Sequence, residues 1–405
     1  MLKIAVLAGI ALVAPSLGAQ GPAASSAGGA GATPVPPPAK KEKFTDSNPA
    51  LLYWQAFALL PELKQPQLKI ITEVLEGRLS ASDPSVGTLL GSTRRALERF
   101  ARAARGTQPC VWGTTLDEGP FAPMPHLTKL QQMCRLALVQ VEAHYASGEL
   151  EKAWTWTKHV HAAARHLAAE PLLITTITQQ GVEQQAIRTT ARHALSLDTD
   201  HGQAIIGDMK AMPPLHTVRE ALTGEHAMAD WMRHMVLGIQ NSPENEQAML
   251  DVAQSLLNAQ SQDADSSKSA AAKQALASME EWKKNAEQGR ELQARAEAAS
   301  TKPWKDYQAD LKEMHASLVD AGQVLKNTLP AFEGAMRKQF ETQTLHIMLF
   351  AVLQPPDEGH LNGEMKGAVD SFEGKALMLN RDAVPWVIST QGSMNGRPLK
   401  LEIGR

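Results

Sequence analysis

The chain has little of what β-sheet, membrane-spanning or nucleic-acid-binding proteins need. Only 5% of its residues are aromatic, and stretches in which Val, Ile or Tyr alternate with polar residues are scarce, which argues against a mainly β fold. After the N-terminus no segment approaches the roughly twenty apolar residues of a membrane-spanning helix. The formal net charge is only −3, so no overall field favours nucleic acid or an anionic membrane as a partner.

The signatures of common enzymes are missing as well. The sequence contains no HExxH, GxSxG or CxxC motif, no phosphate-binding GxxxxGKS/T loop and no GxGxxG dinucleotide-binding turn. No catalytic residue and no cofactor are therefore predicted, and the chain is more typical of a binding protein than of an enzyme.

Cysteine is nearly absent, since the chain has only Cys110 and Cys134. In an oxidising compartment the two could form a disulfide. Its loop of about 25 residues would stabilise the fold by roughly 3.5 kcal/mol through the entropy of the unfolded chain. Two separate buried thiols are the alternative, because a free cysteine packs as a small apolar residue. The sequence leaves both alternatives open.

What the chain does have is helix-forming residues in amphipathic patterns. Apolar residues make up 43% of it, and the helix formers Ala, Leu, Gln, Glu and Lys are abundant. The clearest pattern lies between Pro125 and Pro171, where apolar residues recur every three or four positions on either side of Gly148. Because glycine adopts the left-handed conformation that ends many helices, we predict two helices joined by a tight turn at Ser147–Glu149. Such a short connection makes the helices antiparallel.

Further helices are predicted on both sides of this hairpin. Asn48–Pro49 and Asp83–Pro84 are helix starts, because Asn or Asp can cap a helix whose first residue is proline. The second of these helices extends to Gly106. After the hairpin, apolar periodicity predicts helices at Pro171–Leu197, His201–Met212, Leu215–Gln240, Ala271–Ala299 and Phe332–Leu353.

Short extended segments follow near the C-terminus, at Ala376–Leu379, Pro385–Ser389 and Leu399–Glu402, separated by turn residues. We therefore predict a mainly α fold, an antiparallel helical bundle or short α-solenoid with a small C-terminal β-hairpin or three-stranded sheet. No period of about 34 residues recurs, which argues against a tetratricopeptide array.

The N-terminus is predicted to direct export. Lys3 precedes an apolar run from Ile4 to Ala14 that is too short to span a bilayer, and the small residues of Ser16–Ala19 follow as a cleavage zone. This pattern is typical of a secretory signal peptide. We therefore expect a periplasmic or secreted protein without a transmembrane segment after cleavage.

Composition divides the chain into five parts. The signal peptide occupies residues 1–19, a Pro/Ala/Gly-rich linker 20–43, a helical core domain 44–240, a polar helical hairpin region 241–328, and a C-terminal helix with a small β element 329–405. The linker has too few apolar residues to order itself, and its proline run predicts an extended spacer.

Two features indicate a binding surface. The helix predicted to begin at Pro84 carries five arginines on one side against a single acid, Glu98: Arg94, Arg95, Arg99, Arg102 and Arg105. Arginine binds carboxylates and phosphates through its planar pair of donors, although such a stripe is more often a solvated face. The loop Gln108–Pro125 contains Trp112, which either joins the binding surface or packs beneath the loop beside Cys110. The candidate binding residues are Arg95, Arg99, Arg102 and Trp112.

A metal site is the second hypothesis. His226, Asp230 and His234 follow one another at intervals of four residues on one face of a predicted helix, and imidazoles and carboxylates ligate zinc and similar ions. Glu225 is a candidate for a further ligand. A second histidine group is interpreted as polar positions along a helix seam, in which two pairs of residues each share a face: His159 with His166, and His161 with Arg165.

Several segments together resemble a family of exported, helical bacterial proteins. They are NPALLYWQAFALLP from Asn48, CVWG from Cys110, Gly119–Pro120, the PHL that begins at Pro125, Gly148–Glu149 and LLIT from Leu172. The segment DSFEGKAL from Asp370 resembles a DPFxGKPL element that precedes a closing hairpin in such proteins, with Ser371 in place of proline. The resemblance covers most of 48–235 and about 330–392. It implies a helical fold and export, and it implies no activity.

Together these observations favour an exported helical interaction or scaffold protein of the bacterial envelope, without catalysis. Its expected partner is a protein or another envelope component, and no nucleic acid. Two alternatives stay open: a metal-dependent envelope hydrolase centred on His226, Asp230 and His234, and a small-ligand binder with a groove between helices.

Overall fold

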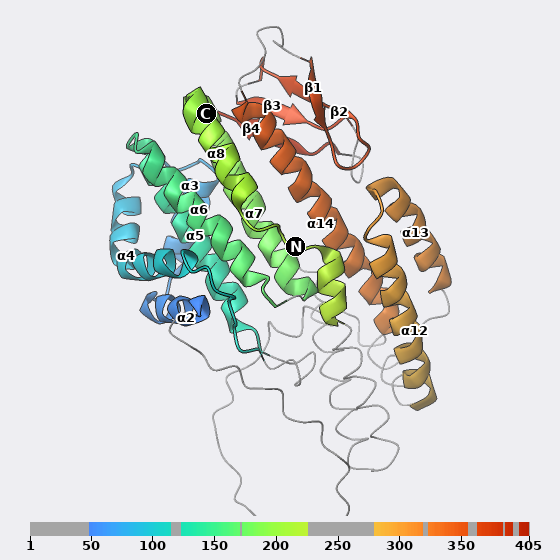
Figure 1. Cartoon of the computed structure of the whole chain (residues 1–405). Coiled ribbons are helices and arrows are strands. Elements are labelled where there is room, and N and C mark those ends of the chain that lie inside the picture. The colour runs from blue at the N-terminus through green and yellow to red at the C-terminus, as the bar shows by residue number, and fades with distance from the viewer. Residues whose placement is uncertain are drawn as a thin grey trace, which may run out of the picture.

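The computed structural model describes residues 48–114, 123–170, 172–225, 279–318, 323–354, 363–383, 385–391 and 397–404. The predicted signal peptide and linker lie outside these residues. Within them the chain is mainly α with a small antiparallel sheet at its C-terminal end, as the sequence predicts (Figure 1). No helix in the described ranges is long and apolar enough to cross a membrane.

The first helices begin where the sequence predicts. The side chain of Asn48 accepts a hydrogen bond from the Ala50 amide at the start of α2 (Pro49–Leu59), and Asp83 does the same for Ser85 at the start of α4 (Pro84–Ala104). Between them lies α3 (Gln65–Leu75). Each cap satisfies an amide that the first helical turn leaves without a partner.

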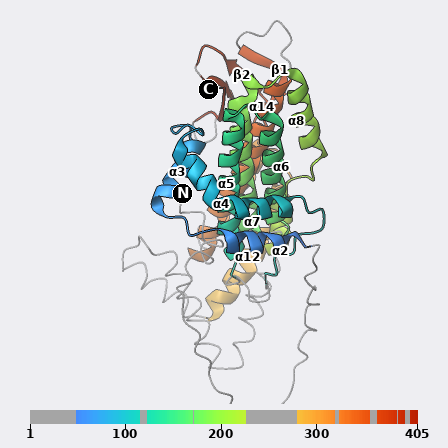
Figure 2. The same ribbon diagram turned by 90° about the vertical axis from the view of Figure 1, so that its left-hand side faces the viewer.

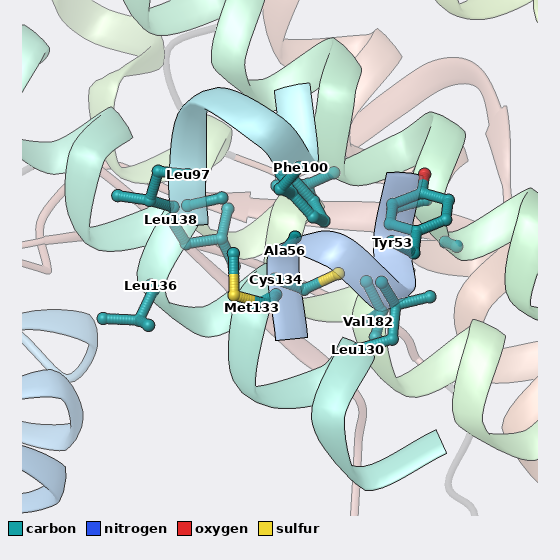
Figure 3. Packing of buried hydrophobic residues seen from close by; sticks show 14 of the residues in the cluster. Tyr53, Ala56, Leu97, Phe100, Leu130, Met133, Cys134, Leu136, Leu138 and Val182 are labelled. Atoms are coloured by element: carbon teal, nitrogen blue, oxygen red, sulfur yellow. The ribbon is translucent and has the colours of Figure 1, made fainter. Parts of the chain in front are cut away.

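The predicted central hairpin is confirmed. It consists of α5 (Pro125–Ala146) and α6 (Leu150–Leu167), and Gly148 between them adopts a φ of 70°. Figure 2 shows α2 and α4 crossing in front of this pair. Buried residues of all four helices form one apolar cluster, part of which Figure 3 shows around Tyr53, Phe100 and Leu130.

Helix α7 (Leu173–His193) lies between the N-terminal and C-terminal parts of the fold. It packs on α5 and α6 on one side and on the long helix α14 (Gln323–Leu353) on the other (Figure 1). Helix α8 (Thr199–Ala211) follows and contacts the end of α14. The two approach so closely that a Cβ on Gly202 would lie 2.7 Å from the Leu353 carbonyl oxygen, so only glycine fits there.

The C-terminal helices build a second apolar cluster. It joins α12 (Met279–Ala299), α13 (Trp304–Ser317) and α14. The prediction that the last long helix begins near Phe332 is wrong, because α14 already begins at Gln323 and continues through Pro330. Pro330 is exposed, whereas the flanking Leu329 and Phe332 are buried in the cluster. This packing outweighs the helix-breaking effect of the proline.

The C-terminal sheet has four strands, one more than the largest sheet predicted. Strands β2 (Ala376–Asn380), β3 (Trp386–Ser389) and β4 (Lys400–Ile403) coincide with the predicted segments, and β1 (Gly363–Val369) precedes them. Neighbours in the order β1-β2-β3-β4 are antiparallel. Strand β4 is fastened to α7, because Arg188 donates to the Lys400 carbonyl at 3.0 Å and the Gly404 amide to the Ala191 carbonyl at 3.3 Å.

Candidate functional site

The arginine face lies on α4, which packs on α2, α5 and α6 through its opposite side. Its apolar residues recur at helical spacing and are buried, among them Val86, Leu97 and Phe100. The arginines lie between these positions, and all are exposed except Arg99, which is half-buried: Arg94, Arg95, Arg99, Arg102 and Arg105. The amphipathic pattern of the helix therefore places the predicted binding arginines toward solvent.

Most of the positive charge on this face has no acidic partner among the described residues. Arg94 lies 3.5 Å from Glu98, with both side chains more than half exposed, and such an exposed pair contributes little stability. Among the described residues, no ion pair involves Arg95, Arg99 or Arg102. Three guanidinium groups within two turns of one helix thus present planar donors without an internal carboxylate.

Trp112, the fourth predicted binding residue, belongs to the core. Its side chain is only 4% exposed, and its indole nitrogen donates to the His166 carbonyl at 2.8 Å. Its ring stacks on His126 at 4.6 Å and on Tyr53 at 5.4 Å. Trp112 packs beneath the loop, as the alternative interpretation of the sequence has it. It offers no exposed face to a partner.

The two cysteines are free thiols in this structure. Cys110 and Cys134 are 3% and 1% exposed and belong to the same apolar cluster. Burial raises the pKa of both thiols well above the usual value. In this state they are unreactive packing residues.

The predicted metal residues His226, Asp230 and His234 lie outside the described residues, so the metal hypothesis stays a prediction. Glu225, the candidate further ligand, is buried and accepts a hydrogen bond from the Leu173 amide at 2.9 Å. It therefore accepts a hydrogen bond from an amide that the first turn of α7 leaves without a helical partner. Burial raises the pKa of its carboxyl. In the part of the chain that the structure describes, no group of three or more His, Cys, Asp or Glu side chains could hold a metal ion.

A buried charged cluster, which the sequence does not predict, surrounds Glu183 of α7. Its carboxylate is fully buried and lies 2.9 Å from His161 Nδ1 and 3.2 Å from Arg165 Nη1, both on α6. His346 of α14 lies 3.0 Å away on its other side. Burial opposes ionisation of Glu183, but the charges of His161 and Arg165 outweigh it and hold the pKa well below its usual value.

His161 and Arg165 do share a face of α6, as their spacing predicts. The partner that they share lies in the middle of α7, in a run rich in Thr and Gln that the sequence marks only as helical. The run of Thr and Gln inside a helix that packs between other helices was the available signal. It did not identify which of those residues would be charged and buried.

A second buried carboxylate, Glu142 of α5, has a similar environment. It accepts hydrogen bonds from Arg192 and, at 2.8 Å, from His193, both at the end of α7. The His193 ring stacks on Tyr145 with centroids 3.9 Å apart. Burial opposes ionisation here too, and the bonds from His193 and Arg192 lower the pKa nonetheless. Each of these two carboxylates therefore joins α7 to a neighbouring helix.

Comparison with models of known protein families, with curated proteins and with solved structures found no match. The resemblance to exported helical bacterial proteins therefore stays a prediction.

Proposed function

We propose that this protein is an exported helical binding protein of the bacterial envelope, which docks an acidic partner on the arginine face of α4. The observation that carries the proposal is that Arg95 and Arg102 are exposed and Arg99 half-exposed, with no internal ion pair among the described residues. The partner would present carboxylates or phosphates, which guanidinium groups bind in pairs of hydrogen bonds.

The rest of α4 supports this function. Its buried side anchors it on α2, α5 and α6, so the arginines stand on a rigid element rather than on a loop. A rigid helix loses little conformational entropy when a partner binds. The predicted signal peptide supports the envelope location, and the absence of common catalytic motifs in the sequence supports binding over catalysis.

The proposal is tested by capture of partners from native envelope extract, with residues 44–405 as bait. The test variant carries Arg95→Glu, Arg99→Glu and Arg102→Glu. We expect the unaltered chain to retain a saturable partner, competed by untagged protein and weakened by salt. The variant should lose that partner while its helical circular dichroism is unchanged.

A matched control variant carries the same change in charge elsewhere. Lys305 and Lys312 on α13 and Lys400 on β4 are exposed, and their replacement by Glu leaves α4 untouched. Capture that survives in the arginine variant, or that is lost equally in the control, would remove the arginine face from consideration. No saturable partner with the unaltered chain would contradict the proposal as a whole.

A further inference from the structure

A polar face of α7, formed by Thr176, Gln179 and Gln180, precedes Glu183 by one to two turns. Thr176 and Gln179 are 0% exposed and Gln180 is 1% exposed. Among the described residues, four of their polar atoms have no hydrogen-bonding partner: the Thr176 hydroxyl oxygen, both polar atoms of the Gln179 amide and the Gln180 amide oxygen. Because such burial forfeits the hydrogen bonds that the same atoms make with water in the unfolded chain, folded proteins rarely leave them unpaired.

Two other glutamines show how this fold satisfies a side-chain amide. Gln184 of α7 donates to Thr342 of α14 at 3.0 Å. Gln293 of α12 is 5% exposed and donates to the Leu222 carbonyl at 2.9 Å. The Gln179 amide is more deeply buried than either, yet no described protein group pairs with it.

Helical spacing turns the polar face toward the same neighbours as Glu183. Its members lie three, four and seven positions before Glu183, and residues at such intervals share one side of a helix. Glu183 lies 3.2 Å from Arg165 of α6 and 3.0 Å from His346 of α14. The polar face therefore belongs to the side of α7 that is turned toward α6 and α14, on both of which α7 packs.

Residues 213–225 cover this side of α7. At the start of the segment, the Pro213 carbonyl accepts a hydrogen bond from Arg165 of α6 at 2.7 Å. In its middle, the Val218 amide donates to Gln339 of α14 at 2.7 Å, and its last residue is bonded to the first turn of α7. The segment thus bridges α6 and α14, which accounts for the burial of the polar face.

The unpaired atoms match the hydrogen-bonding capacity of water. The amide oxygens of Gln179 and Gln180 only accept, Gln179 Nε2 only donates, and the Thr176 hydroxyl does either. A water molecule both donates and accepts, and a buried water typically makes about three hydrogen bonds. A metal cation suits the polar face less well, because the face has no carboxylate of its own and the nearby Glu183 already pairs with Arg165.

We propose that the polar face of α7 is an internal hydration site, in which ordered water bridges Thr176, Gln179 and Gln180 beneath residues 213–225. The water satisfies polar atoms that the neighbouring helices leave unpaired, so it is a structural part of the joint between α6, α7 and α14. The site is independent of the arginine face on α4. An apolar side chain at position 179 should release this water.

The first test counts long-lived internal water in the full chain by ¹⁷O relaxation dispersion, at several temperatures so that slowly exchanging molecules contribute. Gln179→Met replaces the amide with an apolar group of similar length, and Gln185→Met makes the same change at an exposed position of α7. We expect Gln179→Met to lose the signal of at least one water molecule and Gln185→Met to keep the signal of the unaltered chain. Equal signals in all three chains would overturn the proposal.

The second test is a crystal structure of the unaltered chain, which does not depend on whether a variant folds. Electron density for water should lie within hydrogen-bonding distance, about 2.7–3.2 Å, of Gln179 Nε2 and of the Thr176 or Gln180 oxygen. Side chains that turn to bond protein groups directly, or density that only a metal ion or an organic molecule fits, would contradict the hydration site.

Discussion

Acidification should destabilise the N-terminal core through His126. This side chain is only 1% exposed, and burial lowers its pKa from 6.5 to about 4. Between these two values the unfolded chain binds a proton that the folded chain does not, so stability is complete above pH 6.5 and is lost as the pH falls toward 4. For this shift the loss amounts to about 2 kcal/mol at pH 5 relative to pH 8.

The substitution His126→Phe isolates this contribution. Nε2 of His126 has no hydrogen-bonding partner in the described structure, and a phenyl ring can keep the stacking on Trp112. We expect the difference in unfolding free energy between pH 8 and pH 5 to shrink by about 2 kcal/mol in this variant. Urea unfolding at both pH values, followed by circular dichroism and tryptophan fluorescence, measures it.

Two half-buried histidines act in the same direction, because burial also lowers the pKa of His159 and of His166 to about 4. The unaltered chain should therefore lose more stability than His126 alone accounts for. His315→Phe, at an exposed position, is the matched control and should leave the pH dependence unchanged. An equal pH dependence in the unaltered chain and His126→Phe would refute the reasoning.

Two further predictions concern the same core. Asn48→Ala removes the cap of α2 and the hydrogen bonds of the Asn48 side chain to the Val111 amide and carbonyl. The free energy of unfolding, measured by heat or urea, should therefore fall by roughly 2–3 kcal/mol. A fall of less than about 0.5 kcal/mol would mean that the loop does not depend on this residue. Cys110 and Cys134 should react with a thiol reagent only after unfolding, because both are buried and burial raises the pKa of each; two thiols should then be counted without a reductant, whereas none would show that they are bonded.

The sequence predicted the features that depend on residues only a few positions apart. Asn48, Asp83 and Gly148 act within a few residues of a helix end, so their patterns are visible in the sequence. The start of α14 could not be predicted, because Pro330 is a local stop signal that only the packing of Leu329 and Phe332 overrides. Strand β1, with its glycines and no apolar alternation, is a strand because β2 pairs with it.

In the candidate site, too, some features could be predicted from the sequence and others depended on tertiary contacts. Amphipathic spacing along one helix was enough to place Arg95 and Arg102 on an exposed face, since a helix that buries one side must expose the other. Trp112 was ambiguous in the sequence, and contacts with His126 and with the His166 carbonyl decided that it is buried.

The sequence alone determined the mainly α class, the central hairpin and the arginine face, because periodicity and capping act within one or two helical turns. The tertiary structure decided which polar residues share a buried charge. Glu183 meets His346 across 163 positions of the chain, and no local pattern encodes such a pair. The contact exists because α7 packs between α6 and α14, which brings a guanidinium and two imidazoles within 3.2 Å of one buried carboxylate.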